Sequence, residues 1–324
     1  MNEKLLEIKD MTTVFKTDEG AFPAVNEVNL TIDEGEVLCV VGESGSGKTI
    51  TSLSLMQLLP PNGEISSGKL LFNGTDLTLY DKKGINKIRG NQISMIFQDP
   101  MSSLDPVYTC GSQISEAMAI HENTTKKDRY SRTIQLLNQV GIPHPESVYH
   151  AYPHELSGGM CQRVMIAIAL SCNPNLLIAD EPTTALDVTV QAQILKLLNK
   201  IKNERNMGIL FITHDLGVVA EMADKVAVMY GGQIVELCDV YTLFNQPKHP
   251  YTKGLIKSVP NLKKEDEQLY SIPGMVPSIT SMPSGCRFHP RCPISTDRCR
   301  QEEPLLEKIT SQHEVRCWHK DKEA

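Results

Sequence analysis

The sequence has few aromatic residues and no long apolar run. Aromatic side chains make up 5% of its 324 residues, and there is one tryptophan. No stretch approaches eighteen uninterrupted apolar residues, so we expect no membrane-spanning helix. The first ten residues, MNEKLLEIKD, lack the apolar segment of a secretory signal peptide. We therefore expect a cytosolic protein, in which structural disulfides are rare.

Positive charge is also in short supply. Lysine and arginine total 32 against 39 acidic residues, which gives a formal net charge of −7. This balance argues against a dedicated nucleic-acid binder, so we expect no nucleic-acid partner. A hydrophobic content of 40% is ordinary for a soluble globular protein. The length favours one large domain with an appendage, or two domains.

A glycine-rich segment follows the first buried-strand pattern. Residues 36–41, EVLCVV, predict a strand, and apolar periodicity after residue 49 predicts a helix. Between them, GESGSGKT matches G-x-x-x-x-G-K-[ST], a phosphate-binding loop in the context that it requires. Backbone N–H groups and the helix N-terminus would bind phosphate oxygens, a lysine the β- and γ-phosphates, and a threonine hydroxyl Mg²⁺. The predicted site is Gly42, Glu43, Ser44, Gly45, Ser46, Gly47, Lys48 and Thr49.

A pair of carboxylates supplies the second part of a nucleotide-hydrolysing site. The segment NLLIADEPTTALD contains a buried-strand pattern that ends in Asp180 and Glu181. We predict that Asp180 holds Mg²⁺ through water and that Glu181 polarises the attacking water.

A second anion-binding turn precedes an apolar helical run. Ser157, Gly158 and Gly159 would form the N-terminus of that helix. One nucleotide does not need two such surfaces in one chain. We therefore predict a head-to-tail dimer in which this turn caps the γ-phosphate bound at the partner's loop.

At this point the sequence resembles the ATP-binding cassette (ABC) ATPases over about residues 5–250. Its LSGGM segment is similar to their LSGGQ signature, with Met160 in the last position. The resemblance implies that Gln98, in MIFQDP, is the glutamine that touches metal and water and links to the transport partner. It implies that Asp187, at the end of TALD, belongs to the D-loop, and that His214, in LFITHD, contacts the γ-phosphate.

One aromatic residue completes this comparison. Phe15, in TTVFKT, matches the aromatic that stacks on adenine in the family, and Phe22 is the alternative. Glu181, His214 and Gln98 are thus the predicted catalytic residues.

The expected fold is α/β, a P-loop ABC cassette with a small C-terminal cysteine-rich extension. Residues 5–35 are expected to form an antiparallel β subdomain, and residues 101–155 a helical subdomain. A mostly parallel, RecA-like sheet would form the core. We expect the nucleotide-binding domain over residues 1–250 and the extension over residues 251–324.

The composition changes after residue 245. A charged segment, NLKKEDEQ, is followed by a stretch rich in proline, glycine and serine up to residue 285, which predicts an extended arm. The segments HPYT, IPGMVPS and GCRFHPRCP resemble the C-terminal extension of oligopeptide/dipeptide permease ATPases, to which nickel importers are close relatives. With them, the resemblance covers essentially the whole chain.

Cysteine is unevenly distributed. Cys39 and Cys238, in strand-like contexts, are expected to be buried. Cys286, Cys292, Cys299 and Cys317 are crowded into the last 39 residues with the spacing C-x5-C-x6-C-x17-C. Four thiolates in a reducing compartment indicate tetrahedral Zn²⁺ or a [4Fe–4S] cluster, although packing alone stays open. His289, His313 and His319 are alternative zinc ligands. The family resemblance favours the [4Fe–4S] cluster, in a structural or regulatory role.

The predicted function is that of an ATPase subunit that energises import of oligopeptides or dipeptides. Its cofactors would be ATP, Mg²⁺ and the cluster. The resemblance implies a second homologous ATPase subunit, two membrane-spanning permease subunits and, indirectly, an extracellular substrate-binding protein. The chain would work at the cytoplasmic face of the membrane.

Alternatives stay open from the sequence alone. A nickel or other small-solute importer of the same subfamily is one. A repair ATPase would carry a long coiled-coil insertion, and a translation ATPase usually two cassettes; neither is visible. A P-loop kinase would lack LSGGM and the histidine. A pure binding module would have a degenerate site, whereas Lys48, Asp180, Glu181 and His214 are intact.

Overall fold

The computed structural model describes residues 4–183, 186–259 and 270–320. The chain divides into two compact units. Unit 1 comprises residues 1–5, 32–36 and 76–211, and unit 2 comprises residues 6–31, 37–75 and 212–324. The predicted module boundary at residue 250 stays a prediction, since spatial grouping does not define a sequence module.

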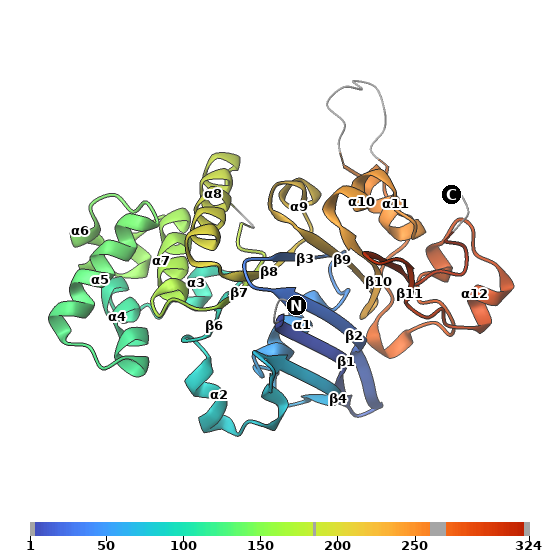
Figure 1. Ribbon diagram of the computed structural model, residues 1–324, viewed down its shortest axis with the longest axis horizontal. Helices are drawn as coiled ribbons and strands as arrows, with labels where there is room; N and C mark the ends of the chain where they lie inside the picture. Colours follow the sequence, from blue (N-terminus) through green and yellow to red (C-terminus); the bar gives the residue numbers. More distant parts are fainter. Residues whose placement is uncertain (1–3, 184–185, 260–269, 321–324) are drawn as a thin grey trace. The chain divides into compact units, whose positions relative to one another are not determined.

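Unit 1 is mainly helical. Its helices are α2 (Lys82–Ile88), α3 (Pro100–Ser103), α4 (Cys110–His121), α5 (Lys126–Gln139), α6 (Pro145–His150), α7 (Gly158–Leu170) and α8 (Val188–Arg205), with 3-10 turns η1 (Leu77–Leu79) and η2 (Pro153–Glu155). The helices expected between residues 101 and 155 are confirmed, and Figure 1 shows α4 to α7 gathered together in green.

Local sequence explains where these helices begin and which faces they bury. Thr125 and Asp128 form a reciprocal capping box at the start of α5. Each side chain accepts a hydrogen bond from the other residue's backbone, which satisfies two N–H groups of the first turn. The buried side chains Leu136 and Leu137 lie near the end of α5, and Ile114 and Met118 lie on α4. Burial of this apolar face holds the bundle together.

The strands β6 (Ile93–Ile96), β7 (Leu176–Asp180) and β8 (Gly208–Thr213) are mostly apolar. β6 pairs in parallel with β7, and β8 follows in the order β8-β7-β6. Every residue of the three strands is buried. Such continuous apolar runs are typical of parallel strands covered on both faces. The strand predicted before Asp180 is confirmed, with Asp180 as its last residue.

Unit 2 contains an antiparallel sheet near the start of the chain. β1 (Lys4–Thr17) lies between β2 (Gly20–Asp33) and β4 (Gly63–Phe72), and the short β5 (Thr75–Asp76) follows β4 in the chain. β1 and β4 pair in antiparallel register, with Leu6 opposite Phe72. The antiparallel section predicted for residues 5–35 is therefore confirmed.

A second sheet of unit 2 carries the phosphate loop and the C-terminal extension. Its strands follow the order β11-β12-β10-β9-β3. They are β3 (Val37–Val41), β9 (Lys225–Tyr230), β10 (Gln233–Asp239), β11 (Glu307–Thr310) and β12 (His313–Val315). β3 and β9 are parallel, whereas β10 pairs in antiparallel register with both β9 and β12.

The remaining helices of unit 2 are short. They are α1 (Lys48–Leu55), α9 (Leu216–Met222), α10 (Val240–Asn245), α11 (Pro250–Lys257) and α12 (Asp297–Gln301), with 3-10 turns η3 (Ile279–Ser281) and η4 (His289–Arg291). Cys39 and Cys238 are buried as predicted, and so are Cys110, Cys161 and Cys172.

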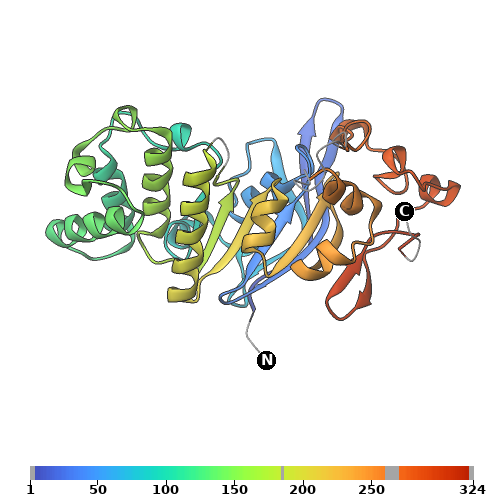
Figure 2. The same ribbon diagram turned by 90° about the horizontal axis from the view of Figure 1, so that it is seen from above.

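The stretch up to residue 285, predicted as an extended arm, contains no helix or strand at its described residues 270–285 apart from the 3-10 turn η3. The rest of the described extension after residue 245 is folded. α11, α12 and the hairpin β11–β12 occupy much of this region, and β12 extends the sheet by pairing with β10. Figures 1 and 2 both show the red C-terminal hairpin beside the orange strand β10. Few apolar residues are needed here, because the added strands use the backbone hydrogen bonds of an existing sheet edge. The charged segment at residues 261–268 lies outside the described residues.

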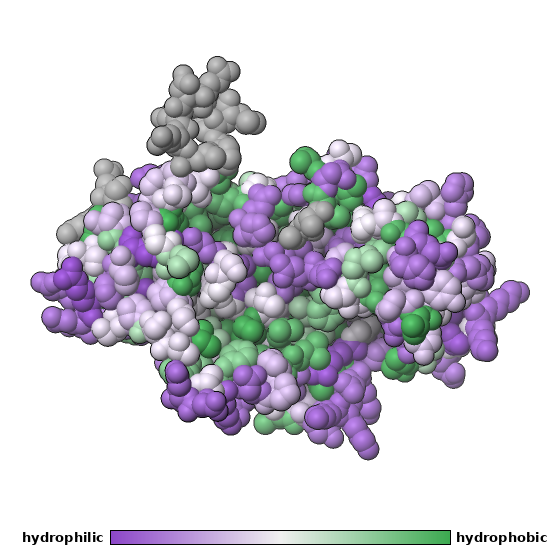
Figure 3. Space-filling view, turned by 180° about the vertical axis from the view of Figure 1, so that it is seen from behind, coloured by the Kyte–Doolittle hydropathy of each residue, from purple (hydrophilic) through white to green (hydrophobic). Residues whose placement is uncertain are grey.

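No helix in the described part of the chain is both long enough and apolar enough to cross a bilayer. The face shown in Figure 3 mixes purple, hydrophilic residues with green, hydrophobic ones.

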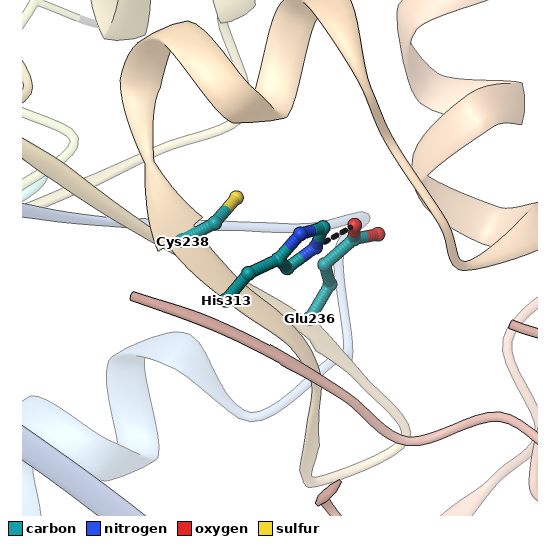
Figure 4. A group of neighbouring side chains, drawn as sticks. All are labelled: Glu236, Cys238 and His313. Carbon is teal, nitrogen blue, oxygen red and sulfur yellow. Dashed lines mark hydrogen bonds and ion pairs between the residues drawn. The ribbon is translucent and has the colours of Figure 1, made fainter. Parts of the chain in front are cut away.

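A fully buried carboxylate joins the C-terminal elements of unit 2. Glu236, on β10, accepts hydrogen bonds from the backbone N–H groups of Lys248 (2.7 Å) and His249 (2.9 Å) and lies 2.8 Å from His313 Nε2. Figure 4 shows the His313 ring beside this carboxylate, with Cys238 on the same strand as Glu236. Burial alone would raise the pKa of Glu236. The hydrogen bonds from His313 and from the backbone N–H groups of Lys248 and His249 outweigh burial and lower it.

We expect Glu236→Gln to destabilise the protein by about 2 kcal/mol at pH 7, because an amide cannot accept all of these hydrogen bonds. The folded-state pKa of Glu236 lies below its ordinary value of 4.5. The stabilisation is therefore complete above pH 4.5 and declines as the pH falls further. Urea unfolding of both proteins between pH 3 and 8 measures the difference. Glu314→Gln, on the neighbouring β12, is the control. A difference that grows as the pH falls would contradict this account.

Candidate functional site

The phosphate loop lies between β3 and α1 in unit 2, as predicted. Gly42, Gly45 and Gly47 have φ angles of 157°, 80° and 103°. A Cβ atom on Gly42 would lie 2.2 Å from the Met229 carbonyl oxygen, so a side chain does not fit there. The glycines let the loop turn tightly in front of the helix.

Two features of the loop fit an anionic ligand. Among the described residues, no side chain caps the N-terminus of α1, which starts at Lys48 after Gly47. Ser46 is buried, and within the described structure its Oγ has no hydrogen-bond partner. Lys48 is buried and donates from Nζ to the carbonyl oxygens of Gly42 (2.7 Å) and Glu43 (3.1 Å). Thr49, in the first turn, is exposed. A helix N-terminus with a lysine at this place suits phosphate groups.

The predicted carboxylates and glutamine lie together in unit 1. Asp180 is buried at the end of β7, and Glu181 follows it with a φ of 47°. This left-handed conformation is uncommon for glutamate and turns its side chain away from the strand direction. Glu181 Oε2 accepts a hydrogen bond of 2.9 Å from Gln98 Nε2. The structure thus brings together Gln98 and Glu181, which are 83 positions apart.

The signature turn and the D-loop aspartate are both helix caps of unit 1. Ser157 caps α7 by accepting from the N–H group of Met160, and Ser157 and Gly158 are exposed while Gly159 is partly buried. Asp187 caps α8 by accepting from the N–H groups of Thr189 (3.0 Å) and Val190 (2.9 Å). Residues 184–185 of the predicted TALD motif lie outside the described residues.

His214 and the loop border one cavity in unit 2. His214 follows β8 directly and is exposed. The cavity of about 260 Å³ is lined by Val41, Gly42, Glu43, His214, Asp215, Leu216, Leu255, Ser258 and Val259. The structure therefore brings His214 close to the start of the phosphate loop. Phe15 is half-buried on β1, opposite Gly63 of β4, and no described contact joins it to the loop.

Sequence reasoning missed a residue that contacts the loop from the extension. The hydroxyl of Tyr251, at the start of α11, accepts a 2.8 Å hydrogen bond from the N–H group of Glu43. Tyr251 is fully buried, and burial raises its pKa, so the hydroxyl stays protonated. The segment HPYT was a visible signal, but nothing local indicates a partner 208 positions away.

The four C-terminal cysteines lie within electrostatic range of one another. Each of the six pairs among Cys286, Cys292, Cys299 and Cys317 interacts. Burial, together with the neighbouring thiols, raises the pKa to about 12 for Cys286 and about 11 for Cys292. Repulsion among thiolates is the situation that a bound cation relieves, so this donor set fits a metal group.

No three of these four sulfurs, all of them in described residues, lie within 4.8 Å of one another. Tetrahedral Zn–S bonds of about 2.3 Å require sulfur–sulfur separations of about 3.8 Å. Among the described residues, the group whose donor atoms all lie within 4.8 Å is instead Glu236, Cys238 and His313.

That group has a simpler explanation than metal binding. The Glu236 oxygens already accept hydrogen bonds from protein donors, and burial with nearby carboxylates raises the pKa of Cys238. The ring of His313 is hydrogen-bonded to Glu236. The other two predicted substitute ligands also have local partners: His289 Nδ1 lies 3.0 Å from the Cys286 carbonyl oxygen, and His319 Nε2 lies 3.1 Å from Thr296 Oγ1.

Comparisons with known protein families match two parts of the chain. The family described as "ABC transporter" matches residues 25–184, and "Oligopeptide/dipeptide transporter, C-terminal region" matches residues 235–299.

Curated relatives match nearly the whole chain. The dipeptide transport ATP-binding protein DppD of Escherichia coli is 49% identical over 313 residues, 97% of this chain and 96% of that protein. The oligopeptide transport ATP-binding protein AppD of Bacillus subtilis is 51% identical over 315 residues, with the same coverage.

Solved structures also match the fold. The ATP-binding cassette MJ0796, in a dimeric post-hydrolysis state bound to ADP and Pi, is 27% identical with a TM-score of 0.67, over 72% of this chain and 98% of that one. CbiO1 from Clostridium perfringens, part of the transporter complex cbiONQ, is 29% identical with a TM-score of 0.65, over 75% and 92%. The predicted cassette fold is therefore confirmed.

Substitution of the loop glycines tests the geometry of the turn. We expect Gly42→Ala to destabilise the protein by about 3 kcal/mol or more, because its Cβ would overlap the Met229 carbonyl oxygen. Gly45→Ala, the matched control, has open space around its Cβ and should cost about 1 kcal/mol for its positive φ. Chemical denaturation measures both. Equal costs would show that the close backbone approach at Gly42 is not limiting.

Proposed function

The chain belongs to the ABC transporter family of ATP-binding proteins, and we propose that it hydrolyses ATP to energise import of dipeptides or oligopeptides through a membrane transporter. One observation carries this proposal: an ABC cassette and the oligopeptide/dipeptide C-terminal region occur in a single chain. Relatives named for peptide transport cover 97% of it at about half identity. A nickel or other small-solute importer is the alternative within the same subfamily.

We assign nucleotide binding to the phosphate loop. Its N–H groups, from Gly42 to Thr49, and the Lys48 side chain would hold the phosphates, and Phe15 would stack on adenine. Thr49, Gln98 and Asp180 would hold Mg²⁺, which when bound neutralises phosphate charge. The uncapped α1 N-terminus supports this assignment.

Hydrolysis is assigned to Glu181, Gln98 and His214. The Glu181 carboxylate would orient and polarise the attacking water, and the amide of Gln98 holds that carboxylate in place. His214 would position the γ-phosphate. The left-handed backbone at Glu181 is the kind of strain that functional sites retain.

A second homologous ATPase subunit is the proposed partner. The exposed turn at Ser157 and Gly158 offers backbone N–H groups that could reach a phosphate held by another chain, and Asp187 lies exposed at the next helix start. A solved structure of similar fold is dimeric. We propose a heterodimer that joins two membrane-spanning permease subunits at the cytoplasmic face. An extracellular substrate-binding protein would act through them.

We expect Glu181→Gln to lower ATP hydrolysis by about 100-fold or more, because the amide cannot accept a proton from water, while ATP still binds. The assembled transporter should then fail to take up labelled dipeptides. Phosphate release, ATP titration and uptake into proteoliposomes are the measurements. Glu146→Gln, exposed on α6, is the control. Undiminished hydrolysis would refute the role of Glu181. Uptake of nickel but not of peptides would favour the alternative substrate.

We also propose that Cys286, Cys292, Cys299 and Cys317 hold a [4Fe–4S] cluster, with Zn²⁺ as the alternative. The mutual electrostatic range of the four thiols supports a metal group at this place. When bound, either group would crosslink a segment that has little apolar core of its own.

Anaerobic purification followed by iron, sulfide and zinc assays tests the metal. We expect iron and sulfide in nearly equal amounts, both lost when any of these four cysteines becomes serine. Cys172→Ala, outside the group, should keep them. Stoichiometric zinc without sulfide would discard the cluster, and no metal would discard both.

A further inference from the structure

Glu43 is the acidic residue of the phosphate loop GESGSGKT, and its charge needs an explanation. Its side chain is 33% exposed. A carboxylate in a loop that binds polyphosphate repels its ligand unless a cation neutralises it. We infer that Arg291, in the cysteine-rich extension, is a positioning residue of the nucleotide site that neutralises and orients Glu43.

The contact between Arg291 and Glu43 is bidentate. Nη1 lies 2.5 Å from Glu43 Oε2, and Nη2 lies 3.0 Å from Oε1. The Arg291 side chain is 4% exposed. A two-pronged pair with a buried guanidinium fixes geometry in a way that a fully exposed ion pair does not.

Further contacts hold the guanidinium itself. Its Nε donates to the carbonyl oxygen of Pro273 (2.7 Å) and Nη2 to that of Ile272 (3.2 Å). The cation also lies 5.7 Å from the centre of the Tyr230 ring. Contacts within the extension therefore fix the position of Arg291. Arg291 in turn orients the Glu43 side chain.

The backbone of Glu43 is held at the same time. Its N–H group donates to Tyr251 Oη, and its carbonyl oxygen accepts from Lys48 Nζ. Tyr251 is packed against Tyr230 and Phe288, with ring centres 4.8 and 5.4 Å apart. The extension thus positions both the side chain and the main chain of this residue.

A second arginine of the extension is linked to the loop indirectly, through the turn at Gly231 and Gly232. Arg287 is buried and donates from Nη1 to the carbonyl oxygen of Gly231. The next residue, Gly232, donates its N–H group to the carbonyl oxygen of Ser46, at 2.8 Å. Two residues of the loop, Glu43 and Ser46, are therefore linked to the extension.

Both arginines are sequence neighbours of cysteines from the four-thiol group. Arg287 follows Cys286, and Arg291 precedes Cys292. The conformation of the cysteine segment therefore sets where the two guanidinium groups lie. The extension acts on the nucleotide site as a support for its loop.

A charge-compensation experiment tests the inference, which rests on the proposed nucleotide binding. ATP affinity of the full chain is measured by calorimetry for wild type, Arg291→Gln, Glu43→Gln and the double variant. We expect Arg291→Gln to weaken affinity about tenfold, because it leaves Glu43 unneutralised. The double variant should recover most of that loss, because it removes the unpaired charge. In the assembled transporter, Arg291→Gln should raise the KM for ATP about tenfold and change kcat less than twofold.

Two further variants keep the test decisive. Arg291→Lys retains the positive charge but cannot make the bidentate contact, so it should lose less ATP affinity than Arg291→Gln. If Arg291→Gln does not fold, Arg291→Lys replaces it in the test. Arg300→Gln, in the same segment but with a side chain 63% exposed, should bind ATP like the wild type. A double variant as weak as Arg291→Gln, or a folded Arg291→Gln with unchanged affinity, would overturn the inference. Absence of ATP binding by the wild type would instead refute the proposed function.

Discussion

A buried carboxylate, Glu236, connects the strand β10, the start of α11 and the C-terminal hairpin. It accepts hydrogen bonds from two backbone N–H groups before α11 and pairs with His313 on β12. A buried charge is tolerated only with such partners, so the three elements must assemble together around it. Their assembly places Tyr251, at the start of α11, against Glu43 of the phosphate loop. The support of the nucleotide site in unit 2 therefore depends on this carboxylate.

The two halves of the proposed hydrolytic site are held in place in different ways. In unit 2, positive-φ glycines and an uncapped helix N-terminus prepare the backbone for phosphate, with Lys48 held by loop carbonyl groups. In unit 1, a strand end presents Asp180, and the strained Glu181 is fixed by Gln98. In both places the main chain holds the functional groups in position in advance, because the main chain is less free to move than a long side chain.

The C-terminal extension has a small apolar core and many polar contacts. Its strands continue a sheet, its arginines reach main-chain and carboxylate oxygens, and its four thiols lie within range of one another. A segment with little apolar surface gains order from such directional contacts and from a metal group. A change in the four-thiol group would thus be transmitted to the loop through Arg287 and Arg291.

The sequence by itself determined the local features: the strand at 37–41, the glycine-rich loop before α1, the strand that ends at Asp180 and the helices after residue 100. These depend on apolar periodicity, glycine and capping residues over short distances, which a sequence displays directly. Only the tertiary structure decided the pairing of Glu43 with Arg291, 248 positions away, the contact of Gln98 with Glu181, and the folding of the extension onto β10. Such contacts depend on which surfaces meet after the chain has folded, and residue spacing carries no signal for that.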